Sequence, residues 1–164
     1  MSKTGQNLQN AFAGESQANR RYLAFAQKAE AEGYSQVAKL FRAAAEAETI
    51  HAHNHLRALD GIKSTKDNLL AAISGENYEY QKMYPQMIAD ATDEAAKNAL
   101  RSFTLANEVE KVHAALYQKA LESLGQNTVT DYYVCSVCGY TAEGEAPDEC
   151  PVCKAKKQAF KKMA

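Results

Sequence analysis

The sequence predicts a mainly α-helical protein, in which a four-helix bundle is followed by a small C-terminal metal domain. Residues up to about 124 are rich in Ala, Leu, Glu, Lys and Gln, which are good helix formers. After Gly125 the composition changes to Val, Tyr, Gly, Pro and Cys, and every cysteine lies between Cys135 and Cys153. We therefore expect a helical domain at 1–125, a linker at 126–131 and a four-cysteine domain at 132–164.

Two helices are expected in the first third of the chain. The first runs over about 5–32, and Gly33 suits the left-handed residue that commonly follows a helix. The second begins after Ser35, a suitable N-cap residue, and stops at Asp60-Gly61. The short connection between them predicts an antiparallel hairpin.

Two more helices are expected before the change in composition. The third begins after Ser64 or Thr65, and Pro85 should kink it because proline removes a helical hydrogen bond and clashes with the preceding turn. The fourth begins near Thr92 and ends at Gly125. A helix of about 32 residues would span roughly 48 Å.

Each predicted helix carries a glutamate on its apolar stripe, where the three- and four-residue spacing faces a core. These residues are Glu15, Glu48, Glu76 and Glu110. A buried carboxylate without a partner is strongly destabilising, and converging carboxylates also repel one another. The stripes carry almost no Lys or Arg. Bound cations would resolve this conflict.

Two of the glutamates belong to a repeated Glu-x-x-His pattern, Glu48 with His51 and Glu110 with His113. One such pair is common by chance on a solvated helix face. Two pairs on alternate helices, with a single glutamate on each of the others, are the arrangement of di-iron carboxylate proteins. His55 could support a ligand or be a polar residue inside the bundle. The remaining candidates are expected at the surface: Glu46, His53 and Glu108.

The cysteines form two Cys-x-x-Cys pairs, Cys135 with Cys138 and Cys150 with Cys153. This spacing is typical of a tetrahedral site of four thiolates, whereas two disulfides or free thiols are the alternative. So short a segment has little apolar surface, and metal binding would supply its folding energy. The spacing does not separate zinc from iron.

Composition argues against several other classes of protein. The formal net charge of -1 offers no basic surface for nucleic acid. No apolar run approaches the roughly 20 residues of a membrane helix. The polar start, MSKTGQNLQN, has no apolar core of a secretory signal, so a cytoplasmic location is expected.

At this point the chain resembles the rubrerythrin family over essentially its full length. The matching stretches are AFAGESQANRRY, FRAAAEAETIHAHNH, GENYEYQKMYP, ANEVEKVHAALY, YVCSVCGY and ECPVCKA. The resemblance implies a ferritin-like di-iron bundle and a rubredoxin-like domain that holds one iron on four thiolates. The implied metal ligands are Glu15, Glu48, His51, Glu76, Glu79, Glu110 and His113 in the bundle, and Cys135, Cys138, Cys150 and Cys153 in the tail.

The resemblance also implies an activity, the reduction of hydrogen peroxide to water as a defence against oxidative stress. Electrons would pass from a NAD(P)H-dependent reductase or a rubredoxin through the thiolate-bound iron to the di-iron centre. Glu79 and His51 would be alternative ligands of one iron, in the oxidised and reduced states respectively. Tyr22 and Tyr84 would hydrogen-bond the ligating carboxylates.

Two other functions fit parts of the pattern. A ferroxidase or iron-storage protein would use the carboxylates, but it needs no attached one-electron carrier. A zinc-stapled helical interaction module would use the cysteines, but it leaves the core carboxylates unexplained. The combination therefore favours the peroxidase.

A homodimer or a multiple of dimers is also expected. From Glu110 to Leu124 the fourth helix rises about 21 Å, and the linker adds at most about 24 Å in an unknown direction. The thiolate-bound iron should then start far from the carboxylates of its own chain, and an antiparallel partner would receive its electrons. The short segment 61–64 permits helix pairs to be exchanged between chains, although a ferritin-like bundle requires one long crossover. The sequence leaves ordinary packing and exchange both open.

Overall fold

The computed structural model describes residues 2–164 and confirms the mainly helical fold class. The helices are α1 (Lys3–Ala31), α2 (Ser35–Ala58), α3 (Thr65–Tyr78), the π-helical turn η1 (Glu79–Met83), α4 (Tyr84–Asp93) and α5 (Lys97–Glu122). The C-terminal elements are β1 (Tyr132–Cys135), β2 (Thr141–Glu143), the 3-10 helix η2 (Lys157–Ala159) and β3 (Phe160–Lys162). The chain divides into two compact units, Met1–Lys63 and Ser64–Ala164, and each is described by itself.

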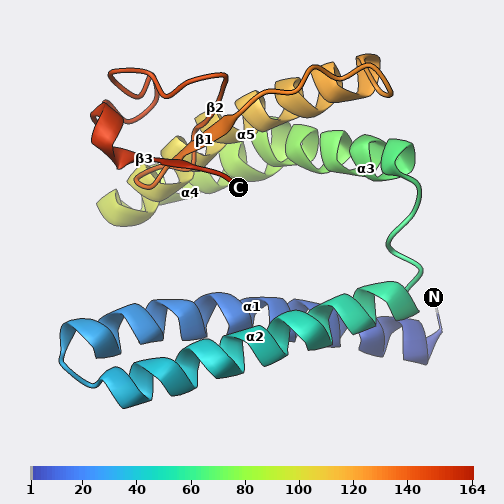
Figure 1. Cartoon of the computed structure of the whole chain (residues 1–164), viewed down its shortest axis with the longest axis vertical. Coiled ribbons are helices and arrows are strands. Elements are labelled where there is room, and N and C mark those ends of the chain that lie inside the picture. Colours follow the sequence, from blue (N-terminus) through green and yellow to red (C-terminus); the bar gives the residue numbers. More distant parts are fainter. Residues whose placement is uncertain (1) are drawn as a thin grey trace. The chain divides into compact units, whose positions relative to one another are not determined.

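The first unit is the antiparallel hairpin of α1 and α2 (Figure 1). Its seam is made of small side chains, which let the two backbones approach closely. Within residues 2–63 the buried side chains are Ala26, Ala29, Ala38, Ala45 and Ala52. Asn19 fastens the seam, because its side-chain amide donates to the Ala45 carbonyl at 2.7 Å and to the Thr49 hydroxyl at 2.8 Å.

At the hairpin turn, the predicted end of α1 is confirmed and the predicted cap of α2 is wrong. Gly33 has φ +84°, so the left-handed residue after α1 is confirmed. The predicted N-cap role of Ser35 is wrong. Helix α2 already includes Ser35, and its hydroxyl donates to the Glu30 carboxylate at 2.9 Å instead of accepting from the helix.

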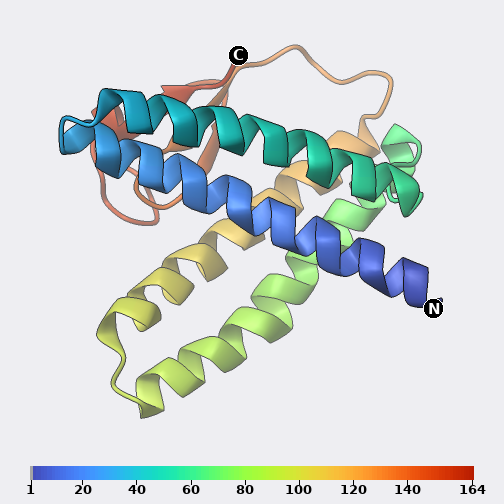
Figure 2. The same cartoon turned by 90° about the horizontal axis from the view of Figure 1, so that it is seen from below.

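The second unit begins with α3, η1 and α4, which run beside α5 (Figure 2). Ser64 caps α3 by accepting from the Asp67 N–H at 3.1 Å, as predicted. The predicted kink near Pro85 takes the form of the π-helical turn. In this turn the Tyr84 N–H reaches back five residues to the Glu79 carbonyl, and Pro85 then stands in the first turn of α4.

The predicted start of the last helix near Thr92 is wrong. Helix α4 continues to Asp93, and the Ala96 N–H closes its end on the Ala91 carbonyl at 2.9 Å. Ala95 has φ +52°, so the backbone reverses there and α5 begins only at Lys97. The closing hydrogen bonds of α4 therefore occupy the segment in which the fourth helix was expected to begin.

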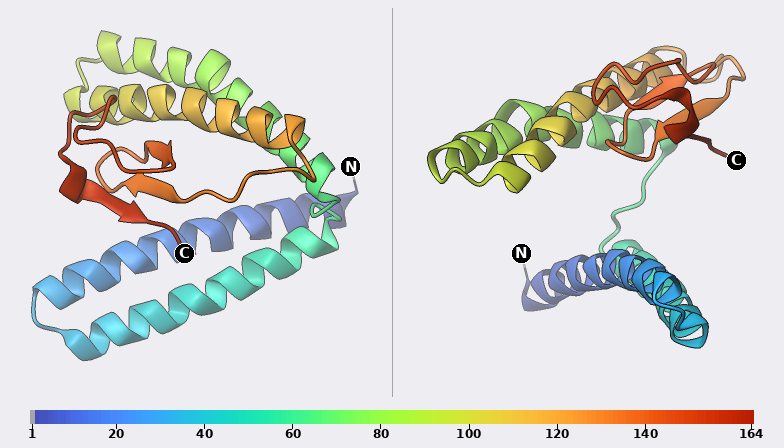
Figure 3. Two further views of the ribbon diagram at one scale, coloured as in Figure 1. Left: turned by 45° about the horizontal axis from the view of Figure 1, so that its top comes forward. Right: turned by 90° about the vertical axis from the view of Figure 1, so that its left-hand side faces the viewer.

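The C-terminal strands form an antiparallel sheet in the order β2-β1-β3, with Val134 paired to both Thr141 and Lys161. The sheet lies beside α5 (Figure 3). Val109 of α5 is only 2% exposed, and a Cβ on Gly139 would lie 3.8 Å from its Cγ1. Gly139 also has φ +87°, which favours glycine. In the described part of the chain, no helix is long and apolar enough to cross a membrane.

Candidate metal centres

The four cysteines converge in the C-terminal sheet domain. The Sγ atoms of Cys135 and Cys153 lie 3.6 Å apart, as do those of Cys138 and Cys150. A disulfide requires about 2.05 Å. Four sulfurs bound at about 2.3 Å to one tetrahedral metal ion would be separated by roughly 3.8 Å. The arrangement therefore fits a tetrathiolate metal site and not a pair of disulfides.

The protonation of these thiols shows why a cation is needed. Burial raises the pKa of Cys135, but the N–H groups of Val137 and Cys138 more than offset it, and the net pKa is lowered. Burial raises the pKa of Cys138 and Cys153. One thiolate is thus easily formed, whereas the full set requires a metal ion to balance the charge.

The first unit contains three converging ligand atoms, which we call the α1–α2 half-site: Glu15, Glu48 and His51. The Nδ1 atom of His51 lies 2.8 Å from a carboxylate oxygen of Glu48, three residues earlier on the same helix face. The side chain of His51 is 53% exposed and that of Glu48 is 18% exposed. The carboxylate is therefore more enclosed than its histidine partner.

The second unit contains an equivalent group, which we call the α3–α5 half-site: Glu76, Glu110 and His113. The Nδ1 atom of His113 lies 2.7 Å from a carboxylate oxygen of Glu110. Burial, together with the adjacent Glu110, raises the pKa of Glu76 to about 7. Burial and Glu110 also raise the pKa of Glu79, so this carboxyl belongs to the same electrostatic environment.

The two predicted catalytic tyrosines occupy related places in the two hairpins. Tyr22 packs on Phe41 with ring centroids 6.1 Å apart, and Tyr84 packs on Phe103 at 6.3 Å. Burial raises the pKa of Tyr84, and three carboxylates raise it further: Glu79, Glu110 and Glu76. Tyr84 therefore keeps its proton and can donate it in a hydrogen bond to a nearby carboxylate.

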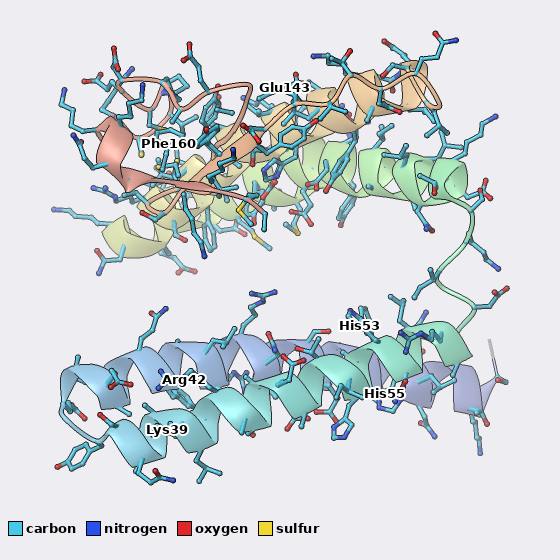
Figure 4. All side chains as sticks on the ribbon, in the orientation of Figure 1. Lys39, Arg42, His53, His55, Glu143 and Phe160 are labelled. Atoms are coloured by element: carbon cyan, nitrogen blue, oxygen red, sulfur yellow. The ribbon has the colours of Figure 1, made fainter. Side chains whose placement is uncertain are left out.

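The other helical candidates lie outside the ligand groups. His53 is exposed and His55 is half-buried, and they leave α2 on different sides (Figure 4). Glu46 and Glu108 are exposed, as expected for solvated positions. Asn107 has a buried side-chain oxygen with no hydrogen-bond partner within residues 2–164, one turn before Glu110.

The sequence missed the contact that joins the two kinds of site. Within the second unit, the Nε2 atom of His113 lies 3.0 Å from the hydroxyl of Thr141 on β2. The linker folds back, because the side-chain amide of Asn127 donates to the Ala120 carbonyl at 3.0 Å. The expectation that the cysteine domain starts far from the carboxylates of its own chain is therefore wrong. The linker 126–131 did not need to cover the distance, because β1 and β2 run back along α5.

These features define a class of protein in which helical carboxylate and histidine ligands are combined with a four-cysteine metal domain. The family model described as rubrerythrin matches residues 6–121, and the model of the rubredoxin-like domain of rubrerythrin matches 133–161. The chain belongs to the rubrerythrin family, so the resemblance seen in the sequence is confirmed.

Individual relatives cover nearly the whole chain. Rubrerythrin-2 of Clostridium acetobutylicum is 37% identical over 96% of this chain and 95% of its own length. Nigerythrin of Nitratidesulfovibrio vulgaris is 35% identical over 96% of this chain and 85% of its own. The solved structure of nigerythrin in a mixed-valence state has a TM-score of 0.59 at 33% identity, over 99% of this chain and 88% of that one.

Family membership identifies the cofactors as non-haem iron at both kinds of site, as predicted. A di-iron centre belongs to the helical domain and a rubredoxin-type iron to the four cysteines. The residues fit this assignment, because carboxylate oxygen and imidazole nitrogen suit iron in the helices and thiolates suit it in the sheet domain.

The metal content can be checked directly. Protein produced in iron-rich medium should contain about three irons per chain, two held by the helical ligands and one on sulfur. Elemental analysis before and after thiol modification measures both pools, and modification should release about one iron per chain. A single metal per chain, fully released by thiol modification, would contradict the di-iron assignment.

The raised pKa of Glu76 predicts how the metal-free protein responds to pH. A folded-state pKa of about 7 against an ordinary value of 4.5 means that folding favours the protonated carboxyl. This contribution to stability is complete below about 4.5 and is lost as the pH rises through about 7. The thermal midpoint of the metal-free protein should therefore fall by on the order of 3 °C between pH 5 and pH 8.

The control for this prediction is Glu76→Gln, which keeps the shape of the side chain and cannot ionise. Its thermal midpoint, followed by helical circular dichroism, should depend less on pH over the same range. An equal pH dependence in the two proteins would show that Glu76 is not the responsible group.

Proposed function

We propose that the chain is a cytoplasmic non-haem di-iron peroxidase that reduces hydrogen peroxide to water and protects against oxidative stress. Its electrons would come from a NAD(P)H-dependent reductase or a rubredoxin and pass through the rubredoxin-type iron. The supporting observation is the 3.0 Å hydrogen bond from the candidate ligand His113 to Thr141, three residues beyond Cys138. A one-electron carrier placed against a ligand serves a redox enzyme, whereas an iron store has no need of it.

The proposed division of the chain follows the same logic. Residues 1–125 would carry the di-iron chemistry, 126–131 would be the linker and 132–164 would carry the rubredoxin-type iron. The proposed helical ligands are Glu15, Glu48, His51, Glu76, Glu79, Glu110 and His113. Glu48 and Glu110 would bridge the two metal positions, and Glu79 and His51 would be alternative ligands in the two oxidation states.

The reaction requires two electrons and two protons for each peroxide, and it yields two water molecules. When bound, the iron pair supplies the two electrons, and the thiolate-bound iron replaces them singly. The residues of the chain would bind the metal ions and donate hydrogen bonds to the ligating carboxylates. Tyr84 retains its proton beside the carboxylates and would donate a hydrogen bond to them, and Tyr22 would do so in the other hairpin.

A variant of one cysteine separates the two sites. Cys138→Ser should abolish the ferric-thiolate colour and reduce NADH-linked turnover to background, because the rubredoxin-type iron is lost. Chemically reduced variant should still consume about one equivalent of peroxide per di-iron centre in a single turnover.

Two other results for Cys138→Ser would contradict the proposed reaction. A folded Cys138→Ser protein that retains its helical iron but consumes no peroxide would place the reaction elsewhere. If it instead oxidises added ferrous iron and accumulates the product, the chain is a ferroxidase.

A complete di-iron centre needs both half-sites, and the connection between α2 and α3 limits how they can meet. Glu48 lies about 15 Å before the end of α2, and Glu76 lies about 16 Å beyond the start of α3. In a ferritin-like bundle these two helices run parallel and are joined by a long crossover. The crossover would have to cover about 31 Å along the axis, whereas the six residues 59–64 reach at most about 25 Å.

We therefore propose a homodimer, or a multiple of it, in which helix hairpins are exchanged. Each centre would combine the α1–α2 half-site of one chain with the α3–α5 half-site of the other. The α1–α2 hairpin is suited to such a partner, because within residues 2–63 it buries only alanines. Its larger apolar side chains are exposed, including Leu40 (68%), Ile50 (54%) and Phe25 (46%).

Mixing two inactive variants tests the exchange. In Glu48→Ala and in Glu110→Ala homodimers every centre lacks one ligand, whether or not hairpins are exchanged. Refolded together in equal amounts, about half of the dimers are mixed, and an exchanged mixed dimer contains one intact centre of its two. Peroxidase activity should then recover to about a quarter of the wild-type value.

A further substitution shows which cysteine domain serves the intact centre. That centre uses α5 of the Glu48→Ala chain, so adding Cys138→Ser to this chain should abolish the recovery. The same addition to the Glu110→Ala chain should leave the recovery unchanged. No recovery in mixed dimers confirmed by native mass spectrometry would contradict exchange and favour an antiparallel arrangement of α2 and α3 within one chain.

A further inference from the structure

Thr141 connects the cysteine domain to a candidate ligand of the helical domain. It is the first residue of β2 and follows the Cys135–Gly139 turn, in which the Gly139 N–H donates to the Cys135 carbonyl at 2.8 Å. Its hydroxyl lies 3.0 Å from Nε2 of His113 and 3.3 Å from the carbonyl oxygen of Gly139. The hydroxyl therefore touches both the metal-binding turn and the imidazole ring.

The directions of these hydrogen bonds follow from the available protons. A carbonyl oxygen only accepts, so the single hydroxyl proton of Thr141 is donated to Gly139. The hydroxyl oxygen is then an acceptor for His113, whose Nε2 must carry the hydrogen. Nδ1 lies 2.7 Å from the Glu110 carboxylate, a contact in which Nδ1–H donates in the metal-free chain; a bound metal ion would replace that proton and take the Nδ1 lone pair.

The surroundings favour this arrangement. His113 and Thr141 both line a cleft of about 350 Å³ whose other residues are largely apolar: Leu69, Leu116, Tyr117, Ala120 and Tyr132. The His113 side chain is 27% exposed, so water competes less for its ring nitrogen than at an open surface.

The α1–α2 half-site provides an internal comparison. His51 has the same spacing from Glu48 and the same Nδ1 contact, at 2.8 Å. Its side chain is 53% exposed. Among the hydrogen bonds of the described residues, none engages its Nε2 atom. The two histidines therefore differ in exposure and in the partner of Nε2, because a hydroxyl from the cysteine domain contacts His113.

We propose that Thr141 is a positioning residue through which the four-cysteine domain holds the Nε2–H of His113 and keeps its Nδ1 turned toward the metal position. The inference rests on the proposed role of His113 as a ligand. Because metal binding supplies much of the folding energy of so small a domain, an occupied four-cysteine site keeps Thr141 in place. Iron loading of the cysteines then strengthens metal retention in the α3–α5 half-site.

The first test reads, without iron, which nitrogen of His113 faces the metal. Full-length protein is labelled with ¹⁵N and given about three zinc ions per chain, enough for the four thiolates and the helical ligands. Long-range ¹H–¹⁵N spectra should show the Nε2–H form for His113 in the wild-type protein and in Thr141→Ser. In Thr141→Val the His113 signals should become a mixture of both forms, while those of His51 do not change.

The second test measures metal retention. Thr141→Val should weaken the binding of cobalt(II) to the α3–α5 half-site about 10-fold, and Thr141→Ser should restore it. The matched control is Thr104→Val, which removes a hydroxyl from α5 that bonds only to the Leu100 carbonyl, at 2.8 Å. Circular dichroism verifies that each variant is folded.

The outcomes separate this inference from the assignment on which it rests. A wild-type His113 in the Nδ1–H form, or a Thr141→Val protein with unchanged tautomer and cobalt affinity, overturns the positioning role. If the His113 signals show the Nε2–H form but do not shift when cobalt binds the helices, His113 is not a ligand, and the proposed di-iron site is overturned instead.

Discussion

Negative charge without protein cations is the constraint on which the rest of the structure depends. Carboxylates converge in both hairpins and thiols converge in the sheet domain, and no arginine or lysine is among the groups that shift the pKa of Glu76 or Glu79. The consequence is visible in the metal-free chain, where Glu76 can remain protonated near neutral pH because burial and Glu110 raise its pKa. A metal ion replaces such protons, so cation binding and folding are linked in all three places.

A second constraint is the small size of the side chains that the α1–α2 hairpin buries. The seam of α1 and α2 is made of alanines, which bring two backbones together but bury little apolar surface. The hairpin nevertheless holds a converging group of ligands, Glu15, Glu48 and His51, while its larger apolar side chains stay exposed. A partner that covers these side chains would add apolar burial that the hairpin lacks by itself.

The sequence predicted what depends on local spacing and left out what depends on the packing of distant segments. The Glu-x-x-His pairs and the Cys-x-x-Cys pairs each converge as expected, because ligands three residues apart on a helix or in a tight turn are neighbours in any fold. The predicted start of α5 near Thr92 is too early, because the hydrogen bonds around Ala95 end α4 there and reverse the backbone, and local sequence does not reveal them. Thr141 could not be recognised, since its importance exists only once β2 lies on α5.

The π-helical turn at Glu79–Met83 has a consequence for how two similar hairpins come to differ. In the first hairpin Tyr22 follows Glu15 by seven residues, whereas in the second Tyr84 follows Glu76 by eight. The spacing on the other helix of each hairpin is the same, because Phe41 precedes Glu48 by seven residues and Phe103 precedes Glu110 by seven. The additional residue is absorbed in the wider turn, which brings Glu79 into the neighbourhood of Glu110 while Tyr84 still stacks near Phe103. A difference of one residue in length thus makes two otherwise similar hairpins chemically unequal, because an additional carboxylate, Glu79, lies near the ligand group of the second.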